Sequence, residues 1–348
     1  MPAIAWARAN LFNSVWNSLL TLVAAYLIAR GFWGLIDWGI VDAVWSAPNG
    51  KTCRAASEAG ACWAFIGQWY RFILFGRYPF AEQWRPLLVV ILIMSLVFAS
   101  CDRRLWQRGP LLGSLWLVGL GACLMLMRGG MLGLALVGTD LWNGLPLTLF
   151  LAVIGLAGAF PLAILLALGR RSTLPTIRAI CVGYIELIRG VPLITVLFMA
   201  SVMLPLFLPA GVTVDNVLRA LVGLMLFYAA YLAEVVRGGL QAIPRGQYEA
   251  ADALGLSYAK KMRLIILPQA LGIAIPPLVN TFISAFKDTT LVTIVGLFDL
   301  LAAAGNAITD PAWRGFYVEA YVFVAAIYFV FCFFMSRYSR YLERSLGR

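Results

Sequence analysis

Residues 237–268 read RGGLQAIPRGQYEAADALGLSYAKKMRLIILP, a charged stretch between two long apolar segments. Pro244 is suited to the start of a helix and Gly255 to its C-terminal end. Glu249 and Asp252 favour the positive end of a short helix between those two residues. The stretch therefore predicts a short helix that ends in a turn, in a loop that lies outside the lipid.

A second short helix is expected in the same loop. Ser257 is a capping residue, basic residues follow it, and Pro268 ends or kinks the helix. In the first helix, Ala250, Ala251 and Ala253 leave almost no side-chain bulk. Such a helix buries too little area to be stable alone, but it can lie close in a groove on another protein. We therefore expect the loop to be a docking element.

The composition around this loop is that of a membrane protein. The chain has 348 residues, of which 62% are hydrophobic and 12% are charged, and its mean hydropathy is +0.87. A soluble domain carries about twice that charged fraction. Because about 20 apolar residues cross the hydrocarbon core, the uncharged runs predict eight helices. They span 11–31, 86–101, 110–127, 142–168, 180–207, 217–236, 267–286 and 317–336.

The distribution of charge predicts the orientation. The formal charge is +11, and basic residues gather in the loops on the side of 237–268 and at the C-terminus. The positive-inside rule places these loops and both termini in the cytoplasm. The apolar run after Arg8 is too long for a signal peptide, so it is predicted to be a membrane helix. No basic stretch is interleaved with aromatic residues, and nucleic acid is not an expected partner.

The sequence lacks the residues and motifs that metal binding, ATP binding and the usual hydrolytic reactions require. The chain has no histidine and no C-x-x-C spacing, so neither a metal site nor a cofactor is expected. It has no G-x-x-x-x-G-K-[ST] phosphate loop and no H-E-x-x-H or G-x-S-x-G motif, and it is not expected to be an enzyme. A secondary transporter or channel and an intramembrane enzyme are the competing hypotheses. The lack of an obvious internal repeat counts against an inverted-repeat transporter.

The loop also matches a known signature. A glutamate and two alanines are followed after three residues by a glycine, and nine residues later by isoleucine, any residue, leucine and proline. This spacing resembles the EAA signature of ABC importer permeases, whose loop forms a coupling helix that docks into the ATP-binding subunit. The resemblance implies an all-α polytopic membrane protein with a five-helix type I ABC importer permease core. It assigns coupling to Glu249, Ala250, Ala251, Gly255, Ile265, Leu267 and Pro268.

Other segments resemble the permeases of polar amino acids, of the histidine and glutamine uptake type. Residues 186–193 (ELIRGVPL) resemble their ELxRGTPLL segment, 287–291 (KDTTL) their KDTSL segment, and 144–149 (GLPLTL) the opening of their first helix. Val191 stands where threonine is usual, which removes any hydroxyl role there. The resemblance implies uptake of polar L-amino acids across the bacterial inner membrane, driven by ATP that a separate subunit hydrolyses. It also implies two ATP-binding subunits, a second permease and a periplasmic amino-acid-binding protein.

The chain is predicted to divide near residue 140. Residues 1–140 form an N-terminal extension of about three helices with a large periplasmic loop, and 141–348 form the five-helix core with the coupling loop at 237–268. Within the extension, Cys62-Trp63, the segment 75–79 and the segment 84–86 resemble the extended permeases of general L-amino-acid transport systems. This enlarged part favours a pair of non-identical permeases, although a homodimer stays open.

Charged residues inside membrane helices are costly, and they are the candidates for the substrate pathway. Glu186 and Arg189 lie three residues apart on one helix face, so they either contact the zwitterionic substrate or pair with each other. Pro276-Pro277 is expected to break the seventh helix and to free backbone groups that can bind a ligand.

Four residues at the end of the seventh helix complete this set. Asp288 is expected either to contact the α-ammonium group of the substrate or to cap a helix. Lys287 either joins the pathway or extends its ammonium to the membrane surface. Thr289 and Thr290 either add hydroxyls to the pathway or bond to local backbone.

Two of the six cysteines lie in the large polar loop. Cys53 and Cys62 are nine residues apart, in a segment that the orientation places in an oxidising compartment. A disulfide is predicted between them, with two free thiols as the alternative. The other four lie in or beside apolar runs, where a thiol behaves as a small hydrophobic group.

Overall fold

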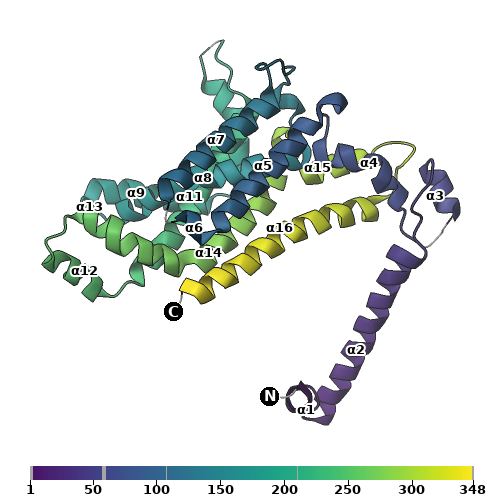
Figure 1. The fold of residues 1–348 in the computed structure, drawn as a ribbon, viewed down its shortest axis with the longest axis horizontal. Helices are drawn as coiled ribbons and strands as arrows, with labels where there is room; N and C mark the ends of the chain where they lie inside the picture. The colour runs from purple at the N-terminus through teal and green to yellow at the C-terminus, as the bar shows by residue number, and fades with distance from the viewer. Residues whose placement is uncertain (1–2, 57–59, 107, 210, 347–348) are drawn as a thin grey trace. The chain divides into compact units, whose positions relative to one another are not determined.

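The computed structural model describes residues 3–56, 60–106, 108–209 and 211–346, with the helices labelled in Figure 1. Within these ranges the chain is helical, and its extended pairings are two isolated bridges, Val44 with Cys62 and Gly144 with Asp299. The chain forms two compact units. The first is Met1–Tyr70 with Ile308–Phe323, and the second is Arg71–Ala307 with Val324–Arg348.

Seven helices in the described part of the chain are long and apolar enough to cross a membrane. Each overlaps one of the predicted runs, which confirms the all-α polytopic fold and seven of the eight predicted helices. They span Val15–Val41, Phe80–Cys101, Gly109–Arg128, Gly144–Arg170, Asn216–Gln241, Tyr258–Val295 and Tyr317–Ser345. The shorter helices are α1 (Ala3–Asn10), α3 (Gly50–Ala56), α4 (Trp63–Phe75), α6 (Arg103–Trp106), α12 (Arg245–Ala253), α13 (Tyr258–Lys261) and α15 (Leu300–Ala307).

The predicted helix over 180–207 is not one continuous helix. It consists of α9 (Pro175–Gly190) and a second helical segment, Leu193–Phe207, that is bent from α9 by 104°. Val191 between them is extended, with φ −107° and ψ 136°. The reason is Pro192, which lacks an N–H group and disfavours the helical conformation at the residue before it.

Three helices form the centre of the second unit: α8 (Gly144–Arg170), α11 (Asn216–Gln241) and α14 (Leu267–Asp288). α11 packs against both α8 and α14 (Figure 1). Small residues allow this close packing because a membrane helix associates through van der Waals contact. Ala159, Ala163 and Ala167 follow one face of α8 at a spacing of four and are all fully buried. A Cβ atom at Gly239 of α11 would lie well inside contact distance of the carbonyl oxygen of Ala270.

The expected break at Pro276-Pro277 is wrong. Both prolines lie inside α14, which continues from Leu267 to Asp288. Membrane helices tolerate proline where neighbouring groups take over the backbone hydrogen bonds. The prolines leave the carbonyl oxygens of Gly272 and Ile273 without an N–H partner, and the hydroxyl of Thr281 donates one turn later, to the carbonyl oxygen of Pro277 over 2.9 Å.

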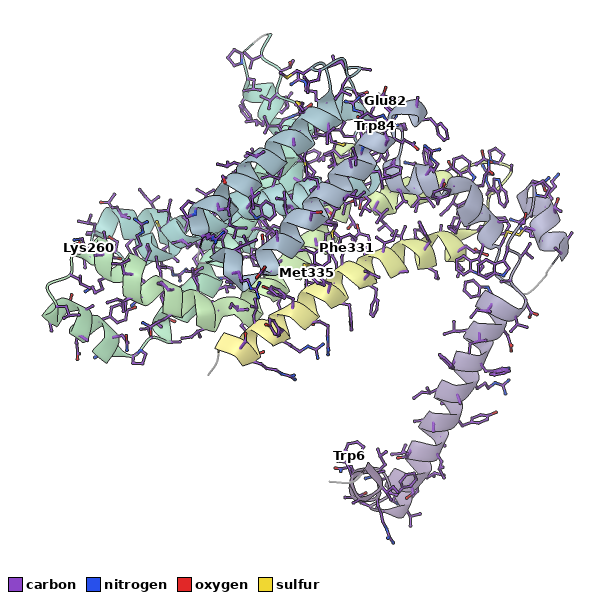
Figure 2. The ribbon with its side chains drawn as sticks, in the orientation of Figure 1. Trp6, Glu82, Trp84, Lys260, Phe331 and Met335 are labelled. Atoms are coloured by element: carbon purple, nitrogen blue, oxygen red, sulfur yellow. A yellow bond between two sulfur atoms is a disulfide. The ribbon has the colours of Figure 1, made fainter. Side chains whose placement is uncertain are left out.

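A buried arginine ties the start of α5 (Trp84–Cys101) to the end of α7 (Gly109–Arg128). The Arg85 side chain is fully buried and donates to the carbonyl oxygens of Leu126, at 2.7 Å, and Ala135, at 2.9 Å. The Tyr78 hydroxyl donates to the carbonyl oxygen of Met127 over 3.0 Å, and burial raises the pKa of Tyr78 to about 12. Figure 2 labels Trp84 at this end of the unit and Lys260 at the end that carries α12 and α13.

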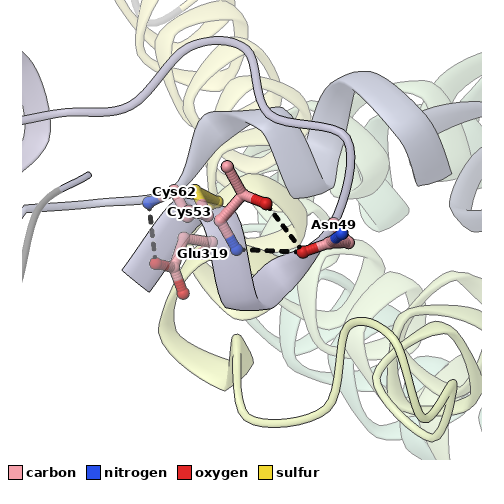
Figure 3. The surroundings of a disulfide bond; sticks show 5 residues. Asn49, Cys53, Cys62 and Glu319 are labelled. Atoms are coloured by element: carbon pink, nitrogen blue, oxygen red, sulfur yellow. Dashed lines mark hydrogen bonds between the residues drawn. A yellow bond between two sulfur atoms is a disulfide. The ribbon is translucent and has the colours of Figure 1, made fainter. Parts of the chain in front are cut away.

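The first unit joins α3, the start of α4 and the first turn of α16 (Tyr317–Leu346). The structure has a disulfide between Cys53 and Cys62, whose Cα atoms lie 6.2 Å apart (Figure 3). The backbone N–H of Cys62 donates to the buried carboxylate of Glu319 over 2.9 Å. Since Cys62 immediately precedes α4, this carboxylate lies at the positive end of that helix.

A count of accessible thiols tests the disulfide. After denaturation in SDS, a maleimide that adds mass is expected to label four cysteines of the native protein, because Cys101, Cys123, Cys181 and Cys332 are free. Prior reduction should raise the number to six. The double variant Cys53→Ser/Cys62→Ser is the control, with four labels under both conditions. Six labels without reduction would contradict the disulfide.

Candidate functional site

The coupling loop begins with α12, which ends in a Schellman motif. The N–H of Gly255 bonds to the carbonyl oxygen of Asp252 over 2.9 Å, and that of Leu256 bonds to Ala251 over 3.2 Å. Gly255 has φ +66°, a left-handed conformation that favours glycine, while the space around it is open. The glycine is therefore favoured by the backbone conformation. Close packing within this chain does not explain it, because a side chain would have room there.

The placing of Glu249 and Asp252 at the positive end of α12 is wrong. The helix starts at Arg245, directly after Pro244, so its first turn contains no acidic residue. Glu249 and Ala250 are exposed, whereas Ala251 is fully buried against the chain itself. The exposed surface of the glutamate and alanine is therefore accessible to another protein.

One exposed residue of this surface is missing from the predicted set. Leu254, the last residue before the glycine, is 75% exposed. An apolar side chain this exposed at the end of an otherwise polar helix is a candidate contact for a partner. Its position next to the glycine that ends the helix is the only signal for it in the sequence.

Polar contacts hold α12 against the membrane helices. The Tyr248 hydroxyl donates to the carbonyl oxygen of Leu240, at the end of α11, over 3.2 Å. Arg171, which follows α8, donates to the same carbonyl oxygen and to the Tyr248 hydroxyl, both over 3.1 Å. Asp252 pairs with Lys261 at 2.5 Å. These contacts connect the coupling loop to both α8 and α11.

The second half of the loop runs into α14 without a break. Ser257 precedes α13, but its side chain makes no capping bond. A π-helical turn, Met262–Ile266, contains Ile265 and joins α13 to α14, in which Leu267 and Pro268 occupy the first turn. Pro268 lacks a backbone donor inside this continuous helix, and the π-helical turn lies directly before it.

A cluster of five charged side chains lies beside this loop. Glu234 of α11 accepts contacts from Arg170 at 3.0 Å, Arg237 at 2.8 Å and Arg189 at 3.8 Å. Arg170 also pairs with Glu186 at 2.8 Å. Glu186 and Arg189 therefore pair with residues of other helices, and not with each other as one hypothesis held. Sequence reasoning missed Glu234 as the centre of this cluster.

A polar pocket of about 370 Å³ opens between α11 and α14. Asp288 lines it, and the Tyr228 hydroxyl donates to the carboxylate of Asp288. The other lining residues are Phe227 and Tyr231 of α11 and Asn280, Thr281 and Ser284 of α14. The pocket thus offers one carboxylate, several neutral hydrogen-bonding groups and aromatic walls, a combination typical of a site for a small polar solute.

The family described as "Binding-protein-dependent transport system inner membrane component" matches residues 159–348. The chain belongs to this family. It is 49% identical to the inner membrane amino-acid ABC transporter permease protein YhdY of Escherichia coli (strain K12), over 98% of this chain and 92% of that protein. It is 39% identical to the glutamate/glutamine/aspartate/asparagine transport system permease protein BztC of Rhodobacter capsulatus, over 99% and 94% of the two chains.

A solved structure supports the same fold. The crystal structure of an amino acid ABC transporter with histidines is 34% identical to the permease, with a TM-score of 0.52. The match covers 58% of this chain and 92% of that chain. The permease is therefore a multi-span membrane protein with the fold of the type I importers.

The remaining predicted pathway residues do not line the pocket of the permease. Lys287 is exposed, and Thr289 is fully buried with its hydroxyl bonded to the carbonyl oxygen of Phe286 over 2.8 Å. Thr290 accepts a bond from Thr293 through its carbonyl oxygen. The pocket residues of α14 that the prediction missed have a visible signal, since they precede Asp288 at helical spacings of three and four.

Proposed function

We propose that the permease carries polar L-amino acids into the cytoplasm. The observation that carries the proposal is the polar pocket at Asp288, in a chain whose relatives are named as amino-acid permeases. An amino acid is a zwitterion, so a path through lipid needs partners for both charges. Asp288 would bind the α-ammonium group, and the amide and hydroxyls of Asn280, Thr281 and Ser284 would bind the carboxylate.

ATP hydrolysis would take place in separate subunits. The sequence has no phosphate loop, and the family of binding-protein-dependent importers implies ATP-binding subunits and a substrate-binding protein. We infer two ATP-binding subunits that contact the exposed surface of α12, a periplasmic amino-acid-binding protein and a second, non-identical permease. The exposed Glu249, Ala250 and Leu254 support this docking surface.

We also propose that both termini lie in the cytoplasm of a bacterium, with residues 1–140 as an extension to a core of 141–348. The basic residues near the coupling loop and in α16 support the orientation. The extension is supported by relatives that match only part of this chain, such as the probable glutamine ABC transporter permease protein GlnM of Bacillus subtilis. The match covers 58% of this chain and 90% of that protein.

Uptake by the reconstituted complex tests the function. The complex is purified from its native membrane by a tag on this chain, its subunits are identified, and it is placed in liposomes with ATP inside or outside. We expect accumulation of radiolabelled L-glutamine or another polar L-amino acid only when ATP is available to the ATP-binding subunits. Accumulation that persists without ATP, at a clamped membrane potential, would instead indicate a secondary transporter.

The hydrogen bonds of Tyr248 are expected to help couple α12 to the membrane helices during transport. Tyr248→Phe removes the hydroxyl that joins α12 to Leu240 and to Arg171. Since a neutral hydrogen bond contributes roughly 0.5–1.5 kcal/mol, uptake should fall about two- to tenfold. The measurement is the rate of amino-acid uptake by the reconstituted complex, with ATP hydrolysis recorded in parallel.

Tyr258→Phe is the matched control. Tyr258 lies in α13 of the same loop, its side chain is 60% exposed and its hydroxyl has no bond to the described residues. This variant should import as the native complex does. Equal losses in the two variants would mean that Tyr248 does not connect α12 to the membrane helices.

A further inference from the structure

A second cavity, of about 220 Å³, lies at the end of the second unit opposite the coupling loop. α8 begins there, with Asn143 before its first residue, and ends at Arg170 beside the coupling loop. Its lining residues are Phe72, Gly76, Arg77, Asn143, Phe298, Ala303 and Asn306.

The wall of this cavity is rigid because two backbone segments touch there. Gly76 and Gly144 have φ values of +57° and +68°. A Cβ atom on Gly76 would overlap Asn143, and one on Gly144 would overlap the carbonyl group of Leu74. The segment that precedes α5 is therefore built into the start of α8, and a residue of the N-terminal extension, Arg77, becomes part of a site on the core.

The cavity is electropositive. The Arg77 side chain is exposed and its guanidinium lies 5.1 Å from the centre of the Phe298 ring, with no ion pair to any residue that the structure describes. No carboxylate is among the lining residues. The positive end of α8, a helix of 27 residues, also points toward it.

Two amide groups add neutral donors around the guanidinium. Asn143 is 3% exposed, and its Nδ2 reaches the carbonyl oxygen of Asp140 at 3.5 Å, longer than an ordinary hydrogen bond. Asn306, in α15, is the second amide of the lining. A lining that combines one guanidinium and two amides with apolar side chains matches a carboxylate that carries a short organic side chain.

We propose that this cavity is a second substrate site, which binds the α-carboxylate of an amino acid through Arg77 before the substrate reaches the pocket at Asp288. The inference rests on the proposed function and deepens it. The two sites are complementary, since one offers a cation to the carboxylate and the other a carboxylate to the ammonium. The recessed Asn143 favours a small solute over a side chain of a docked protein.

Equilibrium binding to the whole complex tests the site. The complex is placed in nanodiscs without the binding protein, and L-glutamine is titrated by saturation-transfer NMR. In an Asp288→Asn background, which weakens the other pocket, we expect L-glutamine binding to remain and Arg77→Gln to weaken it roughly tenfold or more. L-glutaminol, which keeps the ammonium but lacks the carboxylate, should show no dependence on Arg77. Lys51→Gln is the control, because it removes an exposed cation outside the cavity. Its affinity for L-glutamine should equal that of the Asp288→Asn background.

Other outcomes overturn the site. An unchanged affinity of Arg77→Gln for L-glutamine would overturn it. A variant Arg77→Gln that weakened only the affinity for the binding protein would also overturn it, because Arg77 would then contact a carboxylate of that protein. Where Arg77→Gln fails to assemble, Asn306→Cys gives a second measurement. Its labelling by a thiol reagent should slow in the presence of L-glutamine, and an unchanged rate rejects the site. Failure of the wild-type complex to import any amino acid would instead reject the proposed function.

Discussion

Replacement of Gly255 by valine is expected to reduce amino-acid uptake roughly tenfold or more, while the permease still inserts into the membrane. Gly255 has φ +66°, and its N–H closes the Schellman motif that ends α12. A left-handed conformation costs an L-residue about 1–2 kcal/mol, and a β-branched residue more. The strain would unwind the end of α12 and displace Leu254, so the surface proposed for the ATP-binding subunit would be lost. The measurement is uptake and binding-protein-stimulated ATP hydrolysis by the reconstituted complex.

Asparagine at the same position separates conformation from contact. Asn tolerates the left-handed region better than other non-glycine residues, and the space around Gly255 within this chain is open. Gly255→Asn should therefore retain most of the uptake. If both variants were equally inactive, the partner would require the absence of a side chain. If valine left uptake at the native rate, Gly255 would have no role in docking.

The coupling loop could be predicted from sequence because its structure is local. The proline before α12 and the glycine after it act on the backbone within a few residues, and the structure has the helix between them. The predicted position of Glu249 and Asp252 within the loop is wrong, because both lie outside the first turn of α12. Two other wrong predictions concern prolines inside apolar runs. Pro192 breaks its helix and Pro276-Pro277 does not, because the surroundings decide whether the lost backbone bonds find other partners.

The charge cluster and the pocket were predicted only in part, for a different reason. Their contacts join residues that are far apart in sequence. Glu234 pairs with Arg170 and Arg189 of two other helices, and Tyr228 reaches Asp288 across a separation of 60 residues. A sequence pattern identifies charges that are costly in lipid, such as Asp288 and Glu186. It does not say which helices pack together, and that packing decides which charge meets the substrate and which meets another charge.

Asp288→Asn is expected to lower uptake at limiting substrate roughly ten- to a hundredfold. The asparagine keeps the shape of the side chain and can still accept the hydrogen bond of Tyr228, but it removes the charge that faces the pocket. A charge-assisted hydrogen bond contributes about 1.5–3 kcal/mol, which sets the size of the loss. The measurement is the apparent affinity and the rate of uptake for several amino acids, with basal ATP hydrolysis recorded in parallel.

Lys287→Gln is the matched control, because it removes a neighbouring charge that is exposed and does not line the pocket. Its uptake should stay close to that of the native complex. Basal ATP hydrolysis should persist in Asp288→Asn, since it depends on the ATP-binding subunits and on α12, which lie apart from the pocket. A loss of uptake, basal hydrolysis and assembled complex together would make Asp288 a residue needed for folding. If Asp288→Asn kept the uptake rate and apparent affinity of the native complex, Asp288 would only end α14, and the substrate would bind elsewhere.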